Sequence, residues 1–251
     1  MATVLQWIGK PISENGVTER RFNLENDNGA IPGILWAPIK HEHPLPLVLM
    51  GHGGSGHKRT ERQVLLGQRF AGMSQIAAVS IDGPFHGDRV TTHLEPRQYQ
   101  EMMIDVGIEK IINRMIDDWR TTLDTISQLD TIDSDRTAYL GLSMGTRFGL
   151  PFVSATGNRL RCAVLGKNGM QAPAEMNNAS RFKQDAPKIT VPVLFHVQWN
   201  DELFPRDGQF ELFDLLGSQD KRLIAFPGLH GTIAPAAIQV WCEFITQHLF
   251  R

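Results

Sequence analysis

The stretch "RTAYLGLSMGTRFG", residues 136–149, places one serine between two glycines where an apolar, strand-like run gives way to a helical one. Glycines at Gly141 and Gly145 relax a tight turn, and Ser143 could simply cap the helix that follows. A strand–turn–helix of this kind can also be sharp enough to push the serine hydroxyl out of the fold, where a substrate can reach it. The remainder of the chain decides between these interpretations.

Strand-like and helical patterns alternate on both sides of this stretch. Short branched or apolar runs are typical of strands buried on both faces, and a 3.6-residue apolar period is typical of helices. We therefore predict an α/β fold: a mostly parallel central sheet of about eight strands, helices on both faces, and an N-terminal antiparallel hairpin that turns at Asp27-Asn28-Gly29. The runs assigned to strands are 17–26, 30–38, 46–50, 76–82, 137–142, 161–166, 191–197 and 222–226; those assigned to helices are 60–72, 97–129 with a break at Gly107, 144–155, 206–216 and 234–249.

The chain reads as one domain, residues 1–251, without repeats, low-complexity tracts or a linker. Residues 89–117 are more than is needed to join a strand to the next helix, so we expect this segment to be a helical insertion that covers the active site. Within it, Met102 and Met103 are flexible apolar side chains suited to the wall of an acyl pocket. The alternative is that both are ordinary core residues of a longer helix.

Polar and glycine-rich clusters follow five of the predicted strands. The carboxyl ends of parallel strands meet at one edge of a sheet, so all five clusters project to that edge. A serine hydroxyl needs a base to take its proton and an acid to orient the base. Asp201 and then His230 follow Ser143 in the chain, each shortly after a strand, while Glu202 and Asp207 are alternatives for the acid.

These motifs resemble the α/β-hydrolase superfamily, most closely small serine esterases related to dienelactone hydrolase and the acetyl esterases. The resemblance covers nearly the whole chain. It implies that Ser143 is the nucleophile, His230 the general base and then acid, and Asp201 the group that holds the imidazole. The motifs that carry it are His52-Gly53-Gly54, Asp82–Asp88, Gly141-Leu142-Ser143-Met144-Gly145, Asp201–Pro205 and Gly228-Leu229-His230-Gly231.

The resemblance also implies an oxyanion hole formed by the backbone N–H groups of Met144 and Gly54. Gly53 or Ser55 could replace Gly54, because the turn type cannot be deduced from the sequence. Dienelactone hydrolases themselves have a cysteine nucleophile, so Ser143 argues against that activity. The family's usual glycine three residues before the acid is Gln198 here, which bears on the substrate rather than on the triad.

The expected function is a serine esterase that cleaves carboxylic esters of small molecules through an acyl-enzyme, with no cofactor and no metal. Alternatives on the same triad are a peptidase or acyl-aminoacyl hydrolase, a thioesterase, and a carbon–carbon bond hydrolase. The alternative in which the protein is not an enzyme is a relative that has kept the fold and binds a ligand but has lost catalytic activity. His41, His43 and His57 are expected in solvated loops, and His196 in the core.

Composition bears on partners and location. The chain has 25 basic and 27 acidic residues and a net charge of -2, which offers no electrostatic footprint for nucleic acid or an anionic membrane surface. No apolar run approaches the roughly 20 residues of a membrane helix, and the N-terminus does not resemble a signal peptide. Cys162 and Cys242 are expected to be buried free thiols, so we predict a cytoplasmic protein, either a monomer or a homodimer.

Overall fold

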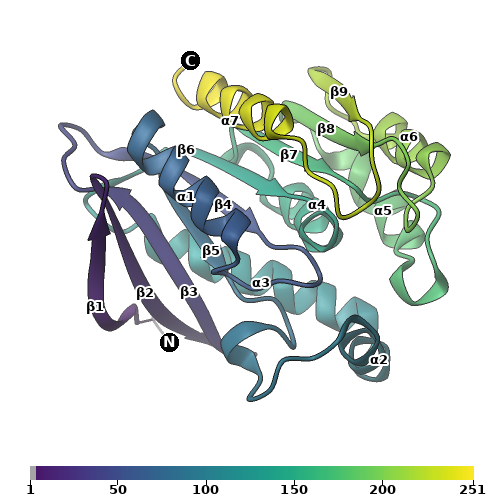
Figure 1. Cartoon of the computed structure of the whole chain (residues 1–251), viewed down its shortest axis with the longest axis horizontal. Helices are drawn as coiled ribbons and strands as arrows, with labels where there is room; N and C mark the ends of the chain where they lie inside the picture. Colours follow the sequence, from purple (N-terminus) through teal and green to yellow (C-terminus); the bar gives the residue numbers. More distant parts are fainter. Residues whose placement is uncertain (1–3) are drawn as a thin grey trace.

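The computed structural model describes residues 4–251 and is built on one nine-stranded sheet flanked by helices (Figure 1). The strands lie in the order β1-β2-β3-β5-β4-β6-β7-β8-β9. β1, β2 and β3 are antiparallel to one another and β3 is antiparallel to β5, whereas every pairing from β5 to β9 is parallel. The strands are β1 Gln6–Glu14, β2 Val17–Asn26, β3 Gly29–Pro38, β4 Leu45–Gly51, β5 Ala77–Ile81, β6 Ile132–Gly141, β7 Cys162–Gly166, β8 Val193–Gln198 and β9 Lys221–Phe226.

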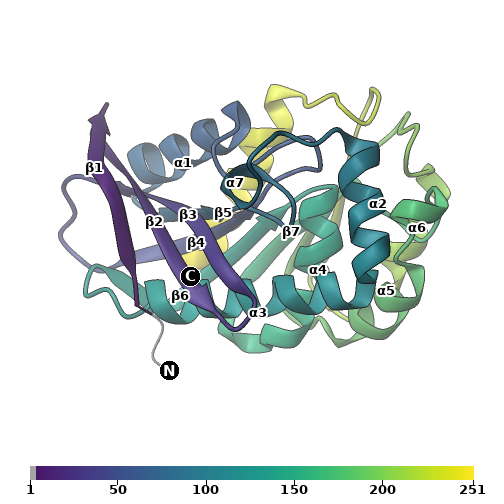
Figure 2. The same ribbon diagram turned by 90° about the horizontal axis from the view of Figure 1, so that it is seen from below.

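Helices cover both faces of the sheet, as Figure 2 shows. On one face α1 and α7 enclose a core that includes Trp36, Phe70 and Trp241. On the other, α3 and α4 enclose a larger core that includes Trp119 and Phe152. The helices are α1 Glu61–Ser74, α2 Pro96–Val106, α3 Ile108–Ile126, α4 Met144–Thr156, α5 Ala179–Asp185, α6 Arg206–Leu215 and α7 Pro235–Leu249.

The predicted α/β class, parallel sheet and N-terminal hairpin are confirmed. The hairpin pairs Asn26 with Gly29, and the Asn26 side chain accepts a hydrogen bond of 2.9 Å from the Asn28 amide, which closes the turn. Gly107, with a φ of 98°, separates α2 from α3 where a helix break was expected. A residue without a side chain adopts this conformation at low cost.

The sheet has one strand more than predicted, because β1 was not recognised. This edge strand is exposed along nearly all of its length, so its side chains show no alternation of apolar and polar residues. Its anchor is Trp7, which packs edge-on against Phe22 of β2 at a ring-centroid distance of 6.2 Å. The seven-residue helix α5 was also missed, since it is too short for a clear helical period.

None of the helices between residues 4 and 251 has both the length and the apolar character required to cross a bilayer. Cys162 and Cys242 are both free and buried, as expected from their apolar surroundings.

Candidate active site

Ser143 occupies a strained turn between β6 and α4. Its φ of 60° and ψ of -117° are costly for a residue with a side chain and are found mainly where surrounding packing enforces them. The flanking glycines permit the turn through close contacts. A Cβ on Gly145 would lie 2.8 Å from the Gly51 carbonyl oxygen, and one on Gly141 would lie 2.7 Å from the Gly145 carbonyl oxygen. Both glycines are therefore required by packing, and the serine side chain points out of the turn.

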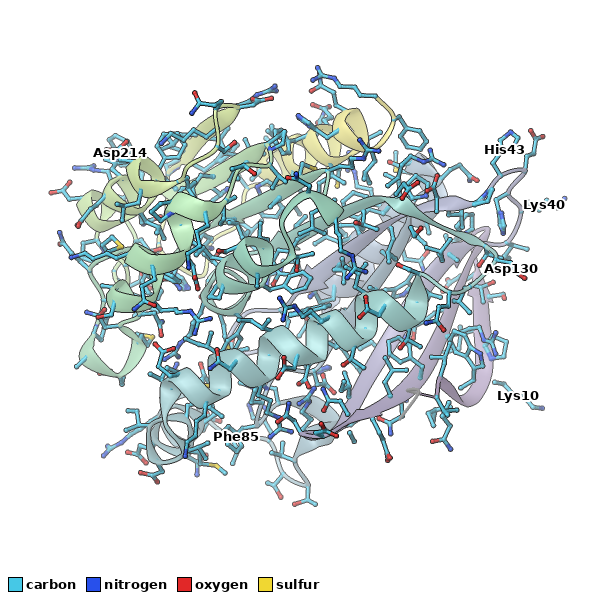
Figure 3. The ribbon with its side chains drawn as sticks, turned by 180° about the vertical axis from the view of Figure 1, so that it is seen from behind. Lys10, Lys40, His43, Phe85, Asp130 and Asp214 are labelled. Carbon is cyan, nitrogen blue, oxygen red and sulfur yellow. The ribbon has the colours of Figure 1, made fainter. Side chains whose placement is uncertain are left out.

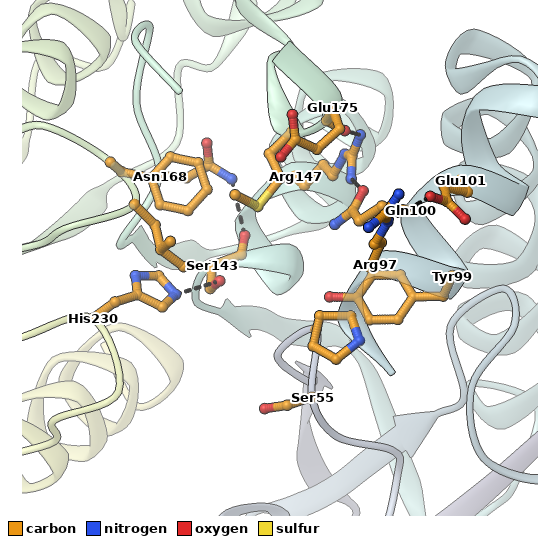
Figure 4. A pocket seen from close by; sticks show the side chains of 15 residues that line it. Ser55, Arg97, Tyr99, Gln100, Glu101, Ser143, Arg147, Asn168, Glu175 and His230 are labelled. Atoms are coloured by element: carbon orange, nitrogen blue, oxygen red, sulfur yellow. Dashed lines mark hydrogen bonds and ion pairs between the residues drawn. The ribbon is translucent and has the colours of Figure 1, made fainter. Parts of the chain in front are cut away.

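Two hydrogen bonds link the side chains of the three residues that were predicted as a triad. Ser143 Oγ is 2.8 Å from His230 Nε2 (Figure 4), and His230 Nδ1 is 2.8 Å from Asp201 Oδ2. Ser143 begins α4, Asp201 follows β8, and His230 lies between β9 and α7. Residues that are distant in sequence thus meet at the carboxyl edge of the parallel strands.

Asp201 is held by its own loop. Its second carboxylate oxygen, Oδ1, accepts hydrogen bonds from the backbone amides of Leu203 at 3.0 Å and Phe204 at 2.9 Å. Glu202, the first alternative acid, accepts the backbone N–H of His230 at 2.7 Å and not a ring nitrogen. Asp207, the other alternative, is exposed on α6. The geometry favours Asp201 as the partner of the imidazole.

Met144 and Gly54, the residues predicted to supply the oxyanion hole, lie close to each other beside Ser143. Met144 is the first residue of α4, so its N–H has no acceptor within the helix. Gly54 lies opposite: a Cβ there would be 3.9 Å from the Met144 Cβ and 2.3 Å from the Tyr99 hydroxyl. The two residues whose N–H groups are expected to form the oxyanion hole therefore lie near each other beside Ser143, and their binding of an oxyanion stays a prediction.

His52 orients the Gly54 amide. The Gly83 N–H donates to His52 Nε2 at 2.8 Å, so the ring proton resides on Nδ1 and is donated to the Gly53 carbonyl, also at 2.8 Å. Because C=O and N–H point in opposite directions across a trans peptide, fixing the Gly53 carbonyl fixes the Gly54 N–H. Burial holds the pKa of His52 well below its usual value, which keeps the ring neutral.

The rest of the glycine turn is anchored by buried polar groups. His86 Nε2 lies 2.8 Å from the Gly54 carbonyl oxygen. Lys58 is almost fully buried and forms ion pairs with Asp82 and Asp88 at 2.5 and 2.7 Å. His52 and His86, which the sequence placed near the site, therefore shape the loops that carry it.

A cavity of about 570 Å³ opens in front of Ser143 (Figure 4). Helix α2 supplies one wall, so part of the 89–117 segment does line the site; whether it acts as a cover stays a prediction. The two methionines proposed as wall residues do not line this cavity. Met103 is fully buried in the core and Met102 is 39% exposed, whereas residues on the adjacent helical face replace them. The lining residues contributed by α2 are Pro96, Arg97, Tyr99, Gln100 and Glu101.

Arg147, one turn after Ser143, is buried beside this cavity. Its guanidinium donates to the Gln100 side-chain oxygen at 2.7 Å, to Asn178 Oδ1 at 3.2 Å and to the Glu175 carbonyl at 3.2 Å. Burial lowers the pKa of Arg147 to about 10. The residue joins α4, α2 and the segment before α5 through neutral acceptors, a role that no sequence pattern indicated.

Two of the other histidines, His196 and His43, take no part in this hydrogen-bonded series. His196 is buried and satisfied, close to Gln198 Oε1 and accepting the Trp241 indole N–H. His43 projects from the edge of the molecule, near Lys40 (Figure 3). Within residues 4–251, no three His, Cys, Asp or Glu side chains are grouped so that they could hold a metal ion.

Comparisons with known proteins give the family. No protein-family model matches the chain, and no curated protein matches it by sequence. A solved structure of a cold-adapted esterase from an Arctic intertidal metagenomic library, bound to polyethylene glycol, is 33% identical with a TM-score of 0.84. The match covers 97% of this chain and 99% of that one.

More distant structures share the fold. An acetyl xylan esterase from Paenibacillus sp. R4 is 16% identical with a TM-score of 0.72, over 98% of this chain and 88% of that one. A protein assigned by name to the dienelactone hydrolases, from Klebsiella pneumoniae, is 15% identical with a TM-score of 0.73, over 94% and 99%. With the 33% identity to the cold-adapted esterase over nearly the whole of both chains, the chain belongs to the α/β-hydrolase superfamily, within its carboxylic ester hydrolases.

Proposed function

We propose that this protein hydrolyses carboxylic esters of small molecules through an acyl-enzyme formed on Ser143. The observation that carries the proposal is the continuous hydrogen-bonded series from Ser143 Oγ through the His230 ring to Asp201 Oδ2, with each step at 2.8 Å. This series opens onto the cavity of about 570 Å³, which has room for a small ester.

In the first half of the reaction, Ser143 Oγ attacks the acyl carbon while its proton passes to His230 Nε2. The imidazolium so formed donates from Nδ1 to the Asp201 carboxylate, which stabilises its charge. The negative charge on the former carbonyl oxygen is accepted by the N–H groups of Met144 and Gly54. Each such donor contributes about 3–4 kcal/mol to transition-state stabilisation in enzymes where it has been removed.

In the second half, the tetrahedral adduct collapses and His230 gives its proton to the departing alkoxide, which leaves as the alcohol. Water then enters, loses a proton to His230 and attacks the acyl carbon. Collapse of this second adduct returns the proton to Ser143 Oγ and releases the carboxylic acid. No metal or cofactor is needed at any step of this sequence.

The direct test is Ser143→Ala, measured with 4-nitrophenyl esters graded from acetate to palmitate. We expect kcat to fall by about 10⁴- to 10⁶-fold, because members of a triad act as a unit. Ser154→Ala, a serine further along α4 and outside the cavity, is the matched control and should retain activity. Near-native turnover by folded Ser143→Ala protein would refute the proposal.

A further inference from the structure

A second pocket lies beside Ser143 and His230. Its volume is about 240 Å³, and it shares both residues and the glycine turn at Gly54 with the larger cavity. It is lined by two cationic side chains, Arg62 and Lys167, and by no carboxylate, whereas the lining of the larger cavity includes two arginines and two glutamates. An ester held at Ser143 therefore has two spaces for its substituents, which differ in charge.

Lys167 is built into this pocket by its backbone. It follows β7 with a φ of 50°, a conformation uncommon for a residue with a side chain, and its N–H donates to the His196 carbonyl at 2.9 Å. Only 3% of Lys167 is exposed. Its ammonium group donates to one neutral acceptor, the Thr232 carbonyl, at 3.1 Å.

Arg62 approaches the same pocket from the first turn of α1. Its Nη2 would be 3.3 Å from a Cβ on Gly53, so the guanidinium lies against the glycine turn. Within residues 4–251, neither Arg62 nor Lys167 has a carboxylate within ion-pair distance, and Arg62 has no hydrogen-bond partner.

Two other buried cations close to the active site, Lys58 and Arg147, have more partners than Lys167. Lys58 has two carboxylate partners, and Arg147 uses its guanidinium on three oxygen acceptors. Burying a charge without a charged partner is unfavourable, and two like charges placed near each other add to that cost. The fold nevertheless brings two cations without a carboxylate partner together next to the reacting serine: Lys167, which is buried, and Arg62, which is partly buried. An unfavourable arrangement of charges of this kind is typical of a binding site in which the ligand supplies the missing opposite charge.

The electrostatics agree with this geometry. Burial lowers the pKa of Lys167 to about 8, and the nearby positive charge of Arg62 acts in the same direction. Asp201 and Glu202 oppose the shift, but Asp201 already binds the His230 ring and Glu202 the His230 backbone. Burial also lowers the pKa of Arg62. A bound anion would relieve both effects.

We propose that the Arg62–Lys167 pocket binds an anionic group of the substrate, so that the preferred esters carry a carboxylate near the scissile bond. This inference rests on the proposed function, since it names the substrate class of the same site. The larger cavity, lined by Tyr99, Met176 and Phe204 among others, then holds the uncharged part. A carboxylate can accept hydrogen bonds from both cations at once, which an uncharged substituent of the same shape cannot do.

The test compares each carboxylate ester with an uncharged ester of the same shape. With the anion on the acyl side, mono-4-nitrophenyl adipate is compared with 4-nitrophenyl 6-methylheptanoate. With the anion on the alcohol side, 4-acetoxybenzoate is compared with 4-isopropylphenyl acetate. Hydrolysis is measured at pH 7 by pH-stat titration of the acid that is released. The quantity compared is the ratio of kcat/KM for the anionic ester to kcat/KM for its uncharged counterpart.

Lys167→Met and Arg62→Gln should each lower this ratio by roughly 10- to 100-fold in at least one pair of esters, the range expected for hydrogen bonds to a charged group. Arg69→Gln is the matched control: it removes the same charge from α1 two turns further along, about 10 Å away, and should leave the ratio unchanged. If one variant fails to fold, the other still provides the comparison.

Equal ratios in the wild type, Lys167→Met and Arg62→Gln for both pairs would overturn the inference. So would an equal fall in Arg69→Gln, because the effect would then be one of net charge. Both outcomes leave Ser143-dependent hydrolysis of the uncharged esters intact. Absence of that hydrolysis would instead refute the proposed function.

Discussion

Replacing Asp201 by Asn is the most informative perturbation of the acid. The two carboxylate oxygens accept different hydrogen bonds. Oδ2 accepts one from His230 Nδ1–H, and Oδ1 accepts two from the backbone N–H groups of Leu203 and Phe204. An asparagine has one oxygen and one NH₂ group, so it can serve only one side. If its oxygen stays with the two amides, its NH₂ faces Nδ1, the ring proton moves to Nε2, and Ser143 loses its base.

The opposite orientation of the asparagine is disfavoured by the same loop. Its NH₂ would face two backbone donors and leave both unpaired, at about 1–3 kcal/mol each, or roughly 2–6 kcal/mol together. The wrong tautomer of His230 therefore dominates. The expected loss in kcat is about 10⁴-fold, the size seen when this orientation is lost in other serine hydrolases.

The assay for Asp201→Asn is steady-state hydrolysis of 4-nitrophenyl acetate, with thermal unfolding to confirm that the fold persists. Glu202→Gln is the control, since an amide oxygen can still accept the His230 backbone N–H, and its kcat should change by less than about tenfold. The assignment of the acid would be refuted if Asp201→Asn left kcat nearly unchanged while Glu202→Gln or Asp207→Asn lowered it by orders of magnitude.

Three further predictions follow from the structure. Met103→Ala should lower the free energy of unfolding, measured by urea titration, by about 2–5 kcal/mol, because Met103 is fully buried. Met102→Ala should lower it by about 0.5 kcal/mol or less, because Met102 is partly exposed. Similar losses in the two variants would contradict the placement of these side chains. His52→Ala should reduce kcat more than it raises KM, because the Gly54 amide loses its support through the Gly53 carbonyl; a change confined to KM would argue against that role. The preference for an anionic ester over its uncharged counterpart should decline as the pH rises through about 8, where Lys167 loses its proton and its charge; a ratio that is constant from pH 7 to 9.5 would count against Lys167 as the anion-binding group.

The elements that the sequence predicted well are those whose periodicity comes directly from burial. Strands such as β4 and β7 are buried at every position and read as apolar runs. The long helix α3 has a continuous apolar stripe, and Gly107 marked its start. The exposed edge strand β1 and the short helix α5 lack such a pattern, because few of their side chains are buried.

At the site, the sequence order predicted which residues meet, since parallel strands bring their carboxyl ends to one edge. Side-chain direction along a helix was less accessible. The cavity is lined by Tyr99 and Gln100 rather than by Met102 and Met103, a difference of a few positions on α2 that depends on how the helix is rotated. Arg62 and Lys167 belong to no recognisable sequence motif, because the role proposed for them rests on their having no carboxylate partner in the folded structure.

The central claim is that Ser143 is the nucleophile that becomes acylated, and labelling with a fluorophosphonate tests it most directly. The wild-type protein is incubated with the reagent, digested, and mapped by mass spectrometry, with the hydrolysis of 4-nitrophenyl acetate followed in parallel. We expect one adduct, on the peptide that contains Ser143, formed in step with loss of activity and absent from Ser143→Ala. An adduct on another residue, or full activity after Ser143 has been labelled, would contradict it.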